Sequence, residues 1–425
     1  MDAALKLAAD QIEDHPVVVS SALAGVTDTL ISLAEEATIG NSQFVSENLK
    51  DLEERHIQAM PDSGGIETSR SRLTRLLTEL KELLRGLSLL KECSPRTHDA
   101  VVAFGELLST TVLHARARAA GMDAVLLDSR DFILTDSGYN SALPDFRKTN
   151  EAVRRIIAPL NGKIYITQGF IGRAPNGATT TLGRGGSDFT AAILGAALGA
   201  AEVQIWTDVN GIMTSDPRIV KSARTVETLS YEEAAELAYF GAKVVHPSTM
   251  QPAIENRIPV LVKNTLDPKG PFTAILEKAT GTGIRAIAGK KHITLINITS
   301  SRMLNAYGFL SRIFSCFERH KTAVDLIATS EVSVSVTIDN DVQIEKIVES
   351  LSEYGTVGVE QDKAIVCLVG KDLWKDSSFI AGVFNCLTDT KVRMISLGSS
   401  DVNLSLVVPE SELEDAMKRL HERFF

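Results

Sequence analysis

The stretch TTLGRGGSDFT, residues Thr180–Thr190, combines three glycines with an arginine, a serine and an aspartate directly before an apolar run at 191–201. Glycines let backbone amides approach a ligand closely, and the guanidinium of Arg184 suits a carboxylate or a phosphate. Ser187 or Asp188 is placed to cap the following helix, whose N-terminus favours anions. The stretch predicts an anion-binding loop, with a plain capped turn as the alternative, and it matches neither common nucleotide-binding glycine motif.

A second group of charged residues, TDVNGIMTSDPR at Thr207–Arg218, follows an apolar strand pattern at 203–206. Side chains at the carboxyl end of a parallel strand point into the crevice where open α/β sheets bind ligands. Asp208, Asp216 and Arg218 are therefore candidates for holding a phosphate tail and its metal. The alternative is a surface loop, because N-G and D-P are both common turn pairs.

A third group, SYEEAAELAYFGAKVVHP, has the pattern of a capped helix followed by a charged turn. Ser230 and Glu233 have the spacing of a capping box, and Gly241 is placed to end the helix. Lys243 then falls in the turn, where a lysine can act as a point charge on a phosphate. His246 precedes a proline, and we expect it to be structural rather than catalytic.

Two further segments carry candidate polar groups. The sequence VVVSSALAGVTD at 17–28 predicts a strand that enters a glycine loop with hydroxyls at Ser20, Ser21 and Thr27. The sequence FGELLST places Glu106 within a helix that begins near residue 99. An isolated glutamate on a helix is usually solvated, so this residue type alone does not assign a role.

The elements that must position these groups alternate along the first two-thirds of the chain. Short apolar runs typical of buried parallel strands lie at 17–21, 164–167 and 203–206. Helical patterns lie at 68–93, 99–120 and 187–201. This alternation predicts an α/β fold whose mostly parallel sheet is sandwiched by helices.

The last third has a different pattern, which occurs twice about 70 residues apart. The first copy has strands at 292–299, 324–329 and 332–338 and a helical repeat within 310–319. The second copy has strands at 364–369, 392–397 and 403–408, with helical spacing at 380–387 and 411–424. Two tandem βαββ units of the α+β, ferredoxin-like kind are predicted. We expect their junction with the first region in the polar stretch near 279–290.

Composition limits the classes of function. The formal net charge of −10 argues against nucleic acid as the main partner, because phosphate backbones require a basic face. No run approaches ~20 apolar residues, so no membrane-spanning helix is expected, and the N-terminus shows no targeting pattern. The four cysteines form no C-x-x-C pair, which favours reduced thiols and a cytoplasmic protein.

Taken in order, VVVSSALAGVTD, FGELLST, ITQGFIG, TTLGRGGSDFTAA, WTDVNGIMTSDPR and FGAKVVHP resemble aspartate kinase of the amino-acid kinase family. The tandem units resemble the two regulatory ACT domains of that family. MLNAYGFL and VDLIATSEVSVSV are most similar to lysine-sensitive, monofunctional members. The resemblance implies an amino-acid kinase domain at 1–285, a first ACT domain at 286–357 and a second at 358–425.

The resemblance also implies an activity, namely phosphoryl transfer from MgATP to the side-chain carboxylate of L-aspartate. The product is 4-phospho-L-aspartate, in the first step toward lysine, threonine, methionine and diaminopimelate. A carboxylate with a reference pKa of about 3.9 is already ionised at neutral pH, so no general base is required. Catalysis then consists of positioning and charge stabilisation.

The implied site residues fall into two groups, and no protein-held metal is expected. Arg184 would bind the α-carboxylate of aspartate and Glu106 its ammonium, while Ser187, Asp188 and the glycine amides would order the substrate and the transferring phosphate. The aspartate pocket would also contain Ser21, Ala22, Thr27 and Phe170. The nucleotide side would contain Thr207, Asp208, Met213, Asp216, Arg218 and Lys243.

The regulatory half implies an amino-acid effector and a homodimer or higher oligomer formed through the ACT domains. Lysine is the expected effector, with threonine or no effector as alternatives. Amides at the start of a helix would bind the effector carboxylate, and Asp325 would bind its α-ammonium. The expected effector residues are Met303, Gly308, Phe309, Leu310, Asp325, Ser330 and Glu331.

The sequence departs from the family in two places. The family's first strand carries Lys-Phe-Gly-Gly-Thr-Ser, whose lysine stabilises the transferring phosphate, and this sequence contains no such motif. Three explanations are open: a start placed too late or a fragment, a non-catalytic amino-acid sensor with working ACT domains, or another cation that substitutes. In addition, Met213 stands where the family has an aromatic residue against the adenine, and Met gives weaker stacking.

Overall fold

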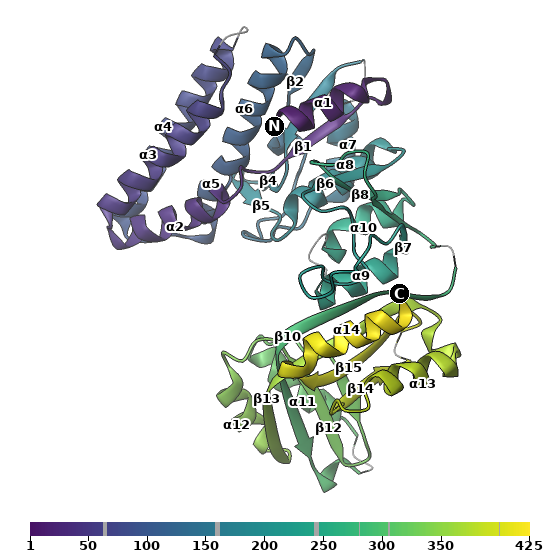
Figure 1. Ribbon diagram of the computed structural model, residues 1–425. Helices are drawn as coiled ribbons and strands as arrows, with labels where there is room; N and C mark the ends of the chain where they lie inside the picture. The colour runs from purple at the N-terminus through teal and green to yellow at the C-terminus, as the bar shows by residue number, and fades with distance from the viewer. Residues whose placement is uncertain (63–65, 158–161, 242–245, 280, 305–306, 399) are drawn as a thin grey trace. The chain divides into compact units, whose positions relative to one another are not determined.

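The computed structural model describes the chain except for residues 63–65, 158–161, 242–245, 280, 305–306 and 399 (Figure 1). The chain forms two compact units. The first unit contains Met1–Asp208 and Val245–Pro268, and the second contains Val209–Val244 and Lys269–Phe425. No helix in the described part of the chain has the length and apolar character needed to cross a bilayer.

The first unit is organised around parallel strands. A three-stranded sheet has the order β1 (Val17–Ser20), β3 (Ile164–Gln168), β2 (Ala124–Leu126), and both pairings are parallel. A second parallel pair joins β6 (Val203–Thr207) to β8 (Val260–Asn264). Every residue of the central strand β3 is buried, as the short apolar run predicts for a parallel strand covered on both faces.

Helices and one hairpin complete the first unit. The hairpin pairs β4 (Ile171–Arg173) with β5 (Thr179–Thr181). In Figure 1 the long helices α3 and α4 lie side by side at the edge of this unit, and their inner faces form a leucine-rich core with α2 and α6. The helices are α1 (Asp2–Asp10), α2 (Val26–Ile39), α3 (Ser42–Ala59), α4 (Glu67–Leu90), α5 (Pro95–Val102), α6 (Phe104–Ala119), α7 (Phe146–Ile157), α8 (Gly186–Leu198) and α10 (Pro247–Glu255).

One predicted helix is two helices in the structure. The pattern at 99–120 predicted a single element, but α5 ends at Val102 and α6 begins at Phe104. The earlier start is set by Ser94, whose hydroxyl caps the backbone amide of Thr97, and by Pro95 at the first helical position. The helices α2 and α3 were not recognised from the sequence.

The second unit contains the capped helix expected from the sequence. The side chain of Ser230 accepts a hydrogen bond from the backbone amide of Glu233, whose carboxylate accepts from the amide of Ser230. This capping box begins α9 (Tyr231–Phe240), so the local prediction is confirmed. Directly before it, β7 (Thr228–Ser230) pairs in parallel with β9 (Thr273–Leu276).

The rest of the second unit is one antiparallel sheet of six strands in the order β11-β12-β10-β13-β15-β14. Two helices pack with each half of the sheet, α11 and α12 around one core and α13 and α14 around another. The strands are β10 (Gly283–Thr299), β11 (Ile327–Thr329), β12 (Ser333–Ile338), β13 (Thr356–Lys371), β14 (Met394–Leu397) and β15 (Asn403–Pro409). The helices are α11 (Phe309–Arg319), α12 (Ile344–Ser352), α13 (Ser377–Cys386) and α14 (Leu413–Phe424).

The two repeats therefore share their central strands. β10 and β13 pair from Gly283 opposite Lys371 to Thr299 opposite Thr356, so each strand runs through both halves of the sheet. The polar stretch 279–290, where we expected the junction, forms part of β10 from residue 283 onward and pairs there with β13. The domain limits 1–285, 286–357 and 358–425 remain predictions.

Candidate active site

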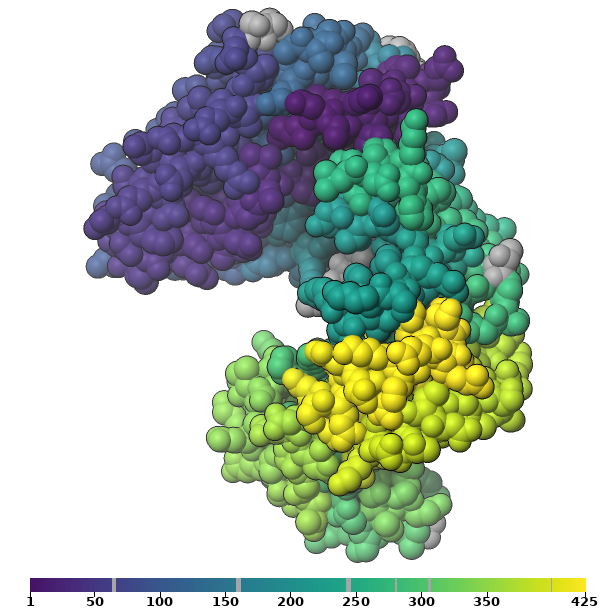
Figure 2. All heavy atoms as spheres, viewed as in Figure 1, coloured from purple at the N-terminus to yellow at the C-terminus, as the bar shows by residue number. Residues whose placement is uncertain are grey.

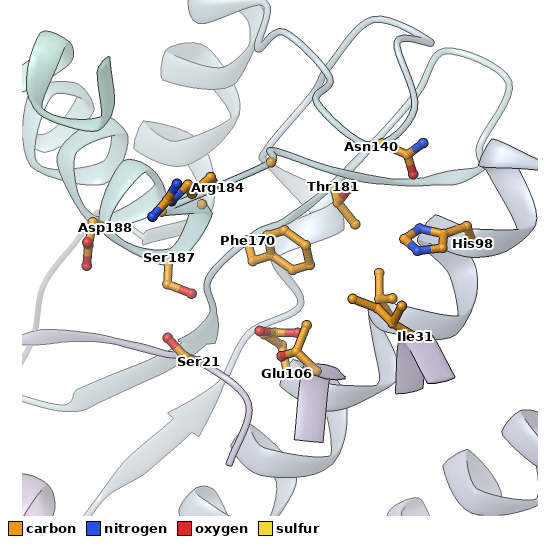
Figure 3. Close-up of a pocket in the computed structure, with 15 residues that line it drawn as sticks. Ser21, Ile31, His98, Glu106, Asn140, Phe170, Thr181, Arg184, Ser187 and Asp188 are labelled. Carbon is orange, nitrogen blue, oxygen red and sulfur yellow. The ribbon is translucent and has the colours of Figure 1, made fainter. Parts of the chain in front are cut away.

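A cavity of about 480 Å³ lies within the first unit, between the β5–α8 loop and the helices α2, α5 and α6 (Figure 3). Most of the residues expected around aspartate line this cavity: Ser21, Thr27, Glu106, Phe170, Arg184, Ser187 and Asp188. They come from sequence positions as far apart as 21 and 188, so the fold brings together groups that the sequence only suggested separately.

The glycine loop reaches the cavity because its backbone takes conformations that side chains disfavour. Gly183 and Gly185 have φ angles of 77° and 68°, and Gly185 precedes the first residue of α8. A Cβ atom on Gly186 would lie 3.0 Å from the Cα of Phe170, and one on Gly169 would lie 2.6 Å from the Cα of Ser187. These glycines allow the N-terminus of α8 to pack against the end of β3.

Phe170 adopts an uncommon backbone conformation at this contact. Its φ angle is 66°, which costs a non-glycine residue about 1–2 kcal/mol. Three polar groups hold it there: its amide donates to the hydroxyl of Thr190 at 3.1 Å, its carbonyl accepts from the amide of Leu182 at 2.8 Å, and Thr190 donates to the carbonyl of Gly186. The ring thereby faces the cavity, as Figure 3 shows.

Glu106 is the most deeply buried charged group at the cavity, with an exposed fraction of 3%. One carboxylate oxygen, Oε1, accepts a hydrogen bond from the amide of Ala22 at 3.1 Å. The other, Oε2, has no hydrogen-bond partner among the described residues. Burial raises the pKa of Glu106 to about 7, against the weaker opposing effect of the Ala22 amide. Ala22 does not line the cavity, and its role is to donate the amide hydrogen bond to this carboxylate.

Asp188 is a second carboxyl group with a raised pKa. It lies in the first turn of α8, where the helix dipole favours a negative charge. Burial nevertheless raises its pKa to about 6. Two poorly solvated carboxyl groups at one cavity favour a ligand that brings positive charge, such as an ammonium or a metal-bound phosphate.

The cavity also contains residues that sequence reasoning missed, among them His98, Asn140 and Thr181. Asp99, which is fully buried, organises two of them. Its carboxylate accepts from the amide of Asn140 at 3.0 Å, and from the amide and the hydroxyl of Thr181 at 2.9 Å each. The available signal in the sequence was the charged Asp99 two positions before the apolar pair Val101 and Val102, which suggests a buried acid that needs hydrogen-bond partners.

The residues expected on the nucleotide side fall in both units. Thr207 is the last residue of β6 and Asp208 follows it, both in the first unit, and the Thr207 hydroxyl donates to Asp208 at 3.2 Å. Met213, Asp216 and Arg218 belong to the second unit. Lys243 lies outside the described residues.

Asp216 and Arg218 bind each other. The guanidinium of Arg218 donates to both carboxylate oxygens of Asp216, with a shortest distance of 2.7 Å. These hydrogen bonds and the positive charge of Arg218 lower the pKa of Asp216. The arginine side chain is 88% exposed, so it remains accessible to an anion, although part of its charge is already compensated.

Most of the expected effector residues lie around the start of α11 and the β11–β12 turn. Gly308 precedes α11 with a φ angle of 75°, while the side chain of Phe309 is buried in the core and leaves only its backbone available. Met303 packs partly against the same core, and Leu310 is 39% exposed. Ser330 and Glu331 form the turn, where the hydroxyls of Ser330 and Ser333 lie 2.7 Å apart.

Asp325 already has partners within the chain. Its oxygen Oδ1 accepts from the ammonium of Lys290 at 2.7 Å and from the hydroxyl of Tyr239 on α9. Lys290 also contacts Asp339 at 2.9 Å and lies over the ring of Tyr239. The second oxygen of Asp325, Oδ2, has no hydrogen-bond partner among the described residues, although the side chain is 1% exposed.

Comparison with known proteins identifies the family. The model of the amino acid kinase family matches residues 2–264, and the ACT domain model matches residues 296–354 and 366–424. The lysine-sensitive aspartokinase 3 of Escherichia coli strain K12 is 37% identical, over 96% of this chain and 92% of the relative. This chain belongs to the aspartokinases. Aspartokinase 1 of Arabidopsis thaliana, a chloroplastic relative, is 38% identical over 97% of this chain and 75% of its own length.

Two solved aspartokinase structures are similar over nearly the whole chain. Escherichia coli aspartokinase III in complex with aspartate and ADP, an R-state, has a TM-score of 0.85 and 36% identity, covering 100% of this chain and 96% of that one. The same enzyme in complex with lysine and aspartate, a T-state, has a TM-score of 0.79 and 37% identity, covering 96% and 92%. The expected fold, an amino-acid kinase followed by ACT domains, is confirmed.

The burial of Glu106 predicts a dependence of stability on pH. Because its pKa is about 7 in the folded chain and the reference value is 4.5, the folded state holds the proton more tightly. This contribution to the free energy of unfolding is present below pH 4.5 and is lost as the pH rises through 7. Glu106→Gln, which stays neutral, should therefore raise the free energy of unfolding by about 1–3 kcal/mol at pH 8 and by much less near pH 5.

Urea unfolding of both proteins at the two pH values measures this difference. Glu35→Gln is the matched control, since Glu35 is an exposed glutamate on α2, and it should change stability little at either pH. An equal effect of Glu106→Gln at pH 5 and pH 8 would show that the carboxyl group is not desolvated in the folded chain.

Proposed function

We propose that this chain transfers the γ-phosphoryl group of MgATP to the side-chain carboxylate of L-aspartate, which yields ADP and 4-phospho-L-aspartate for amino-acid biosynthesis. The observation that carries the proposal is the cavity that places Glu106, with one unpaired oxygen, opposite the cationic loop of Arg184. An α-amino acid presents an ammonium and a carboxylate, which these two groups complement. The aspartokinase III structure that holds aspartate and ADP supports this choice of substrates.

The proposed mechanism is one of positioning. The acceptor carboxylate is ionised at neutral pH and attacks without a general base. Arg184 holds the α-carboxylate, and Glu106 holds the ammonium through Oε2, with Ser21, Thr27 and Phe170 around the substrate and Ala22 behind it. The amides at the N-terminus of α8, together with Ser187 and Asp188, order the reacting carboxylate and the transferring phosphoryl group. Preorganised donors of this kind stabilise charge that develops in the transition state.

The proposed nucleotide side consists of Thr207, Asp208, Met213, Asp216, Arg218 and Lys243. Magnesium is part of the substrate MgATP in this proposal. No cluster of three metal-binding side chains occurs among the described residues, and Mg²⁺ in kinases is commonly held by one or two carboxylates together with phosphates and water. The proposal therefore places the ion with the phosphates of the nucleotide.

Aspartate-dependent release of ADP from MgATP by this chain tests the proposed reaction. Glutamate in place of aspartate, and MgATP without an acceptor, are the controls. Because the sequence lacks the Lys-Phe-Gly-Gly motif, activity would mean that another cation stabilises the transferring phosphate, with Lys243→Ala as the next variant to assay. Absence of aspartate-dependent ADP release, with lysine still bound, would favour the alternative of a non-catalytic amino-acid sensor.

The proposed role of Arg184 predicts a specific loss. Arg184→Ala removes the partner of the α-carboxylate, so kcat/KM for aspartate should fall about 10²–10³-fold while lysine binding and the fold are unchanged. Steady-state kinetics and lysine titration calorimetry measure both quantities. Arg173→Ala is the matched control, because Arg173 is an exposed arginine on the nearby strand β4. Normal aspartate kinetics in Arg184→Ala would remove Arg184 from the substrate site.

We also propose lysine as the inhibitory effector, bound by Asp325 together with residues 303, 308–310, 330 and 331. The lysine complex of aspartokinase III supports this choice. In this chain the ammonium of Lys290 already neutralises Oδ1 of Asp325, which leaves Oδ2 for the ammonium of an effector. Inhibition requires lysine to bind an inactive conformation more tightly than the active one.

The competition for Asp325 predicts opposite effects of two substitutions. Asp325→Asn should raise the lysine concentration for half-inhibition more than about tenfold, because a charged partner is lost. Lys290→Met should lower it several-fold, because the carboxylate is then free of its internal ammonium. Lys291→Met is the control, since Lys291 pairs with Glu414 instead. Unchanged lysine inhibition in both variants would exclude Asp325 from the effector site.

Two further assignments belong to the proposal. A homodimer formed through the ACT domains is supported by apolar side chains on the terminal strands of the six-stranded sheet, where Ile327 and Ile395 are each 45% exposed. A reducing, cytoplasmic location is supported by the four cysteines, all of which are unpaired.

A further inference from the structure

The C-terminal helix α14 carries a histidine that the proposed mechanism does not use. The helix forms part of the surface of the second unit, where it is yellow in Figure 2, but the side chain of His421 on its inner face is 3% exposed. The imidazole stacks on the ring of Phe425 at 4.7 Å. Its Nε2 lies 2.9 Å from the hydroxyl of Thr214, and its Nδ1 lies 3.4 Å from the hydroxyl of Ser222. Both hydroxyls belong to a segment about 200 residues earlier in the chain.

The hydrogen bonds around Thr214 are compatible with a neutral ring that accepts at Nε2. The Thr214 hydroxyl oxygen accepts from the amide of Arg224 at 3.0 Å, so its own hydrogen is available to the imidazole. When that hydrogen is donated to Nε2, the proton of a neutral ring is on Nδ1 and points to Ser222. Burial lowers the pKa of His421, and the nearby charge of Arg224 lowers it further, which is consistent with a neutral ring. A neutral imidazole therefore joins α14 to both sides of one loop.

That loop, residues 208–227, contains no helix and no strand beyond a single bridge between Met213 and Thr225. Both backbone polar groups of Thr214 are hydrogen-bonded. The amide of Thr214 donates to the carbonyl of Arg224 at 2.8 Å, and its carbonyl accepts from the amide of Ile287 on β10 at 2.8 Å. An irregular loop has few repeating backbone bonds to define its shape, so side-chain contacts of this kind largely determine it.

Thr214 lies next to Met213 and two residues before Asp216, and both are assigned to the nucleotide side. We propose that His421 is a positioning residue for the nucleotide, which acts through Thr214 and Ser222 to hold the 213–218 loop in its binding conformation. The inference rests on the proposed function, because it takes MgATP as the ligand of that loop. It assigns to the last helix of the regulatory region an indirect role in binding the substrate nucleotide.

The test compares variants that keep or remove the polar contact. His421→Phe fills the space without either ring nitrogen, and we expect it to raise KM for ATP about 5–20-fold while KM for aspartate stays within about twofold. Thr214→Val should also raise KM for ATP, although it additionally removes the acceptor of the Arg224 amide. The effects of the two substitutions should be less than additive in the double variant, because both remove the contact between His421 and Thr214. His421→Gln, which retains an acceptor for Thr214, should recover part of the affinity.

His320→Phe is the matched control, since it removes a histidine–serine contact with Ser350 in the other half of the sheet. MgADP binding by calorimetry supplies a readout that does not require turnover, and circular dichroism checks the fold of each variant. Equal MgADP affinity in wild type and folded His421→Phe would overturn this inference alone, as would equal changes in both KM values. No MgADP binding by the wild-type chain would overturn the proposed function and this inference together. If His421→Phe does not fold, Thr214→Val is tested instead, with the same measurements of MgADP affinity and of the two KM values.

Discussion

The candidate active site depends on the close approach of the N-terminus of α8 to the end of β3. The approach leaves no room for a Cβ atom at Gly169 or Gly186, and it holds Phe170 in a left-handed conformation between a threonine hydroxyl and the backbone of Leu182. Because helix and strand meet so tightly, the loop between β5 and α8 turns its cationic and polar side chains toward one cavity. The glycine loop and Phe170 are positioned by this contact.

Electrostatics then gives the cavity its preference for ligands. Glu106 and Asp188 both have raised pKa values, about 7 and about 6, because burial removes water that would stabilise their charges. Few groups among the described residues stabilise the negative charges of these carboxylates. The side chain of Glu106, for example, accepts a hydrogen bond in the described part of the chain only from the amide of Ala22. A positively charged ligand stabilises the ionised carboxylates in place of the missing water. The free energy that desolvation of these carboxylates costs the folded chain is thereby regained when the ligand binds.

In the second unit, the proposed effector site and the proposed nucleotide site share structural elements. β10 supplies the amide of Ile287 that holds Thr214, supplies Lys290 to Asp325, and forms the centre of the six-stranded sheet. Tyr239 on α9 reaches the same aspartate, and His421 on α14 reaches the same loop as Ile287. A change in the conformation of the sheet would therefore reach the 213–218 loop directly through the hydrogen bonds of Ile287 and His421 to Thr214.

Sequence alone determined those features that depend on neighbours a few residues away. The capping box of Ser230 and Glu233, the turn glycines before α8 and the apolar strands β1, β3 and β6 follow from local spacing, because caps and burial periods operate over three or four residues. The tertiary structure decided the features that depend on distant partners. Asp99 acquires its role from Asn140 and Thr181, Glu106 its raised pKa from burial within the folded unit, and His421 its contacts from Thr214. Burial and hydrogen-bond partners depend on which helices and strands pack together, and local sequence patterns do not predict that packing.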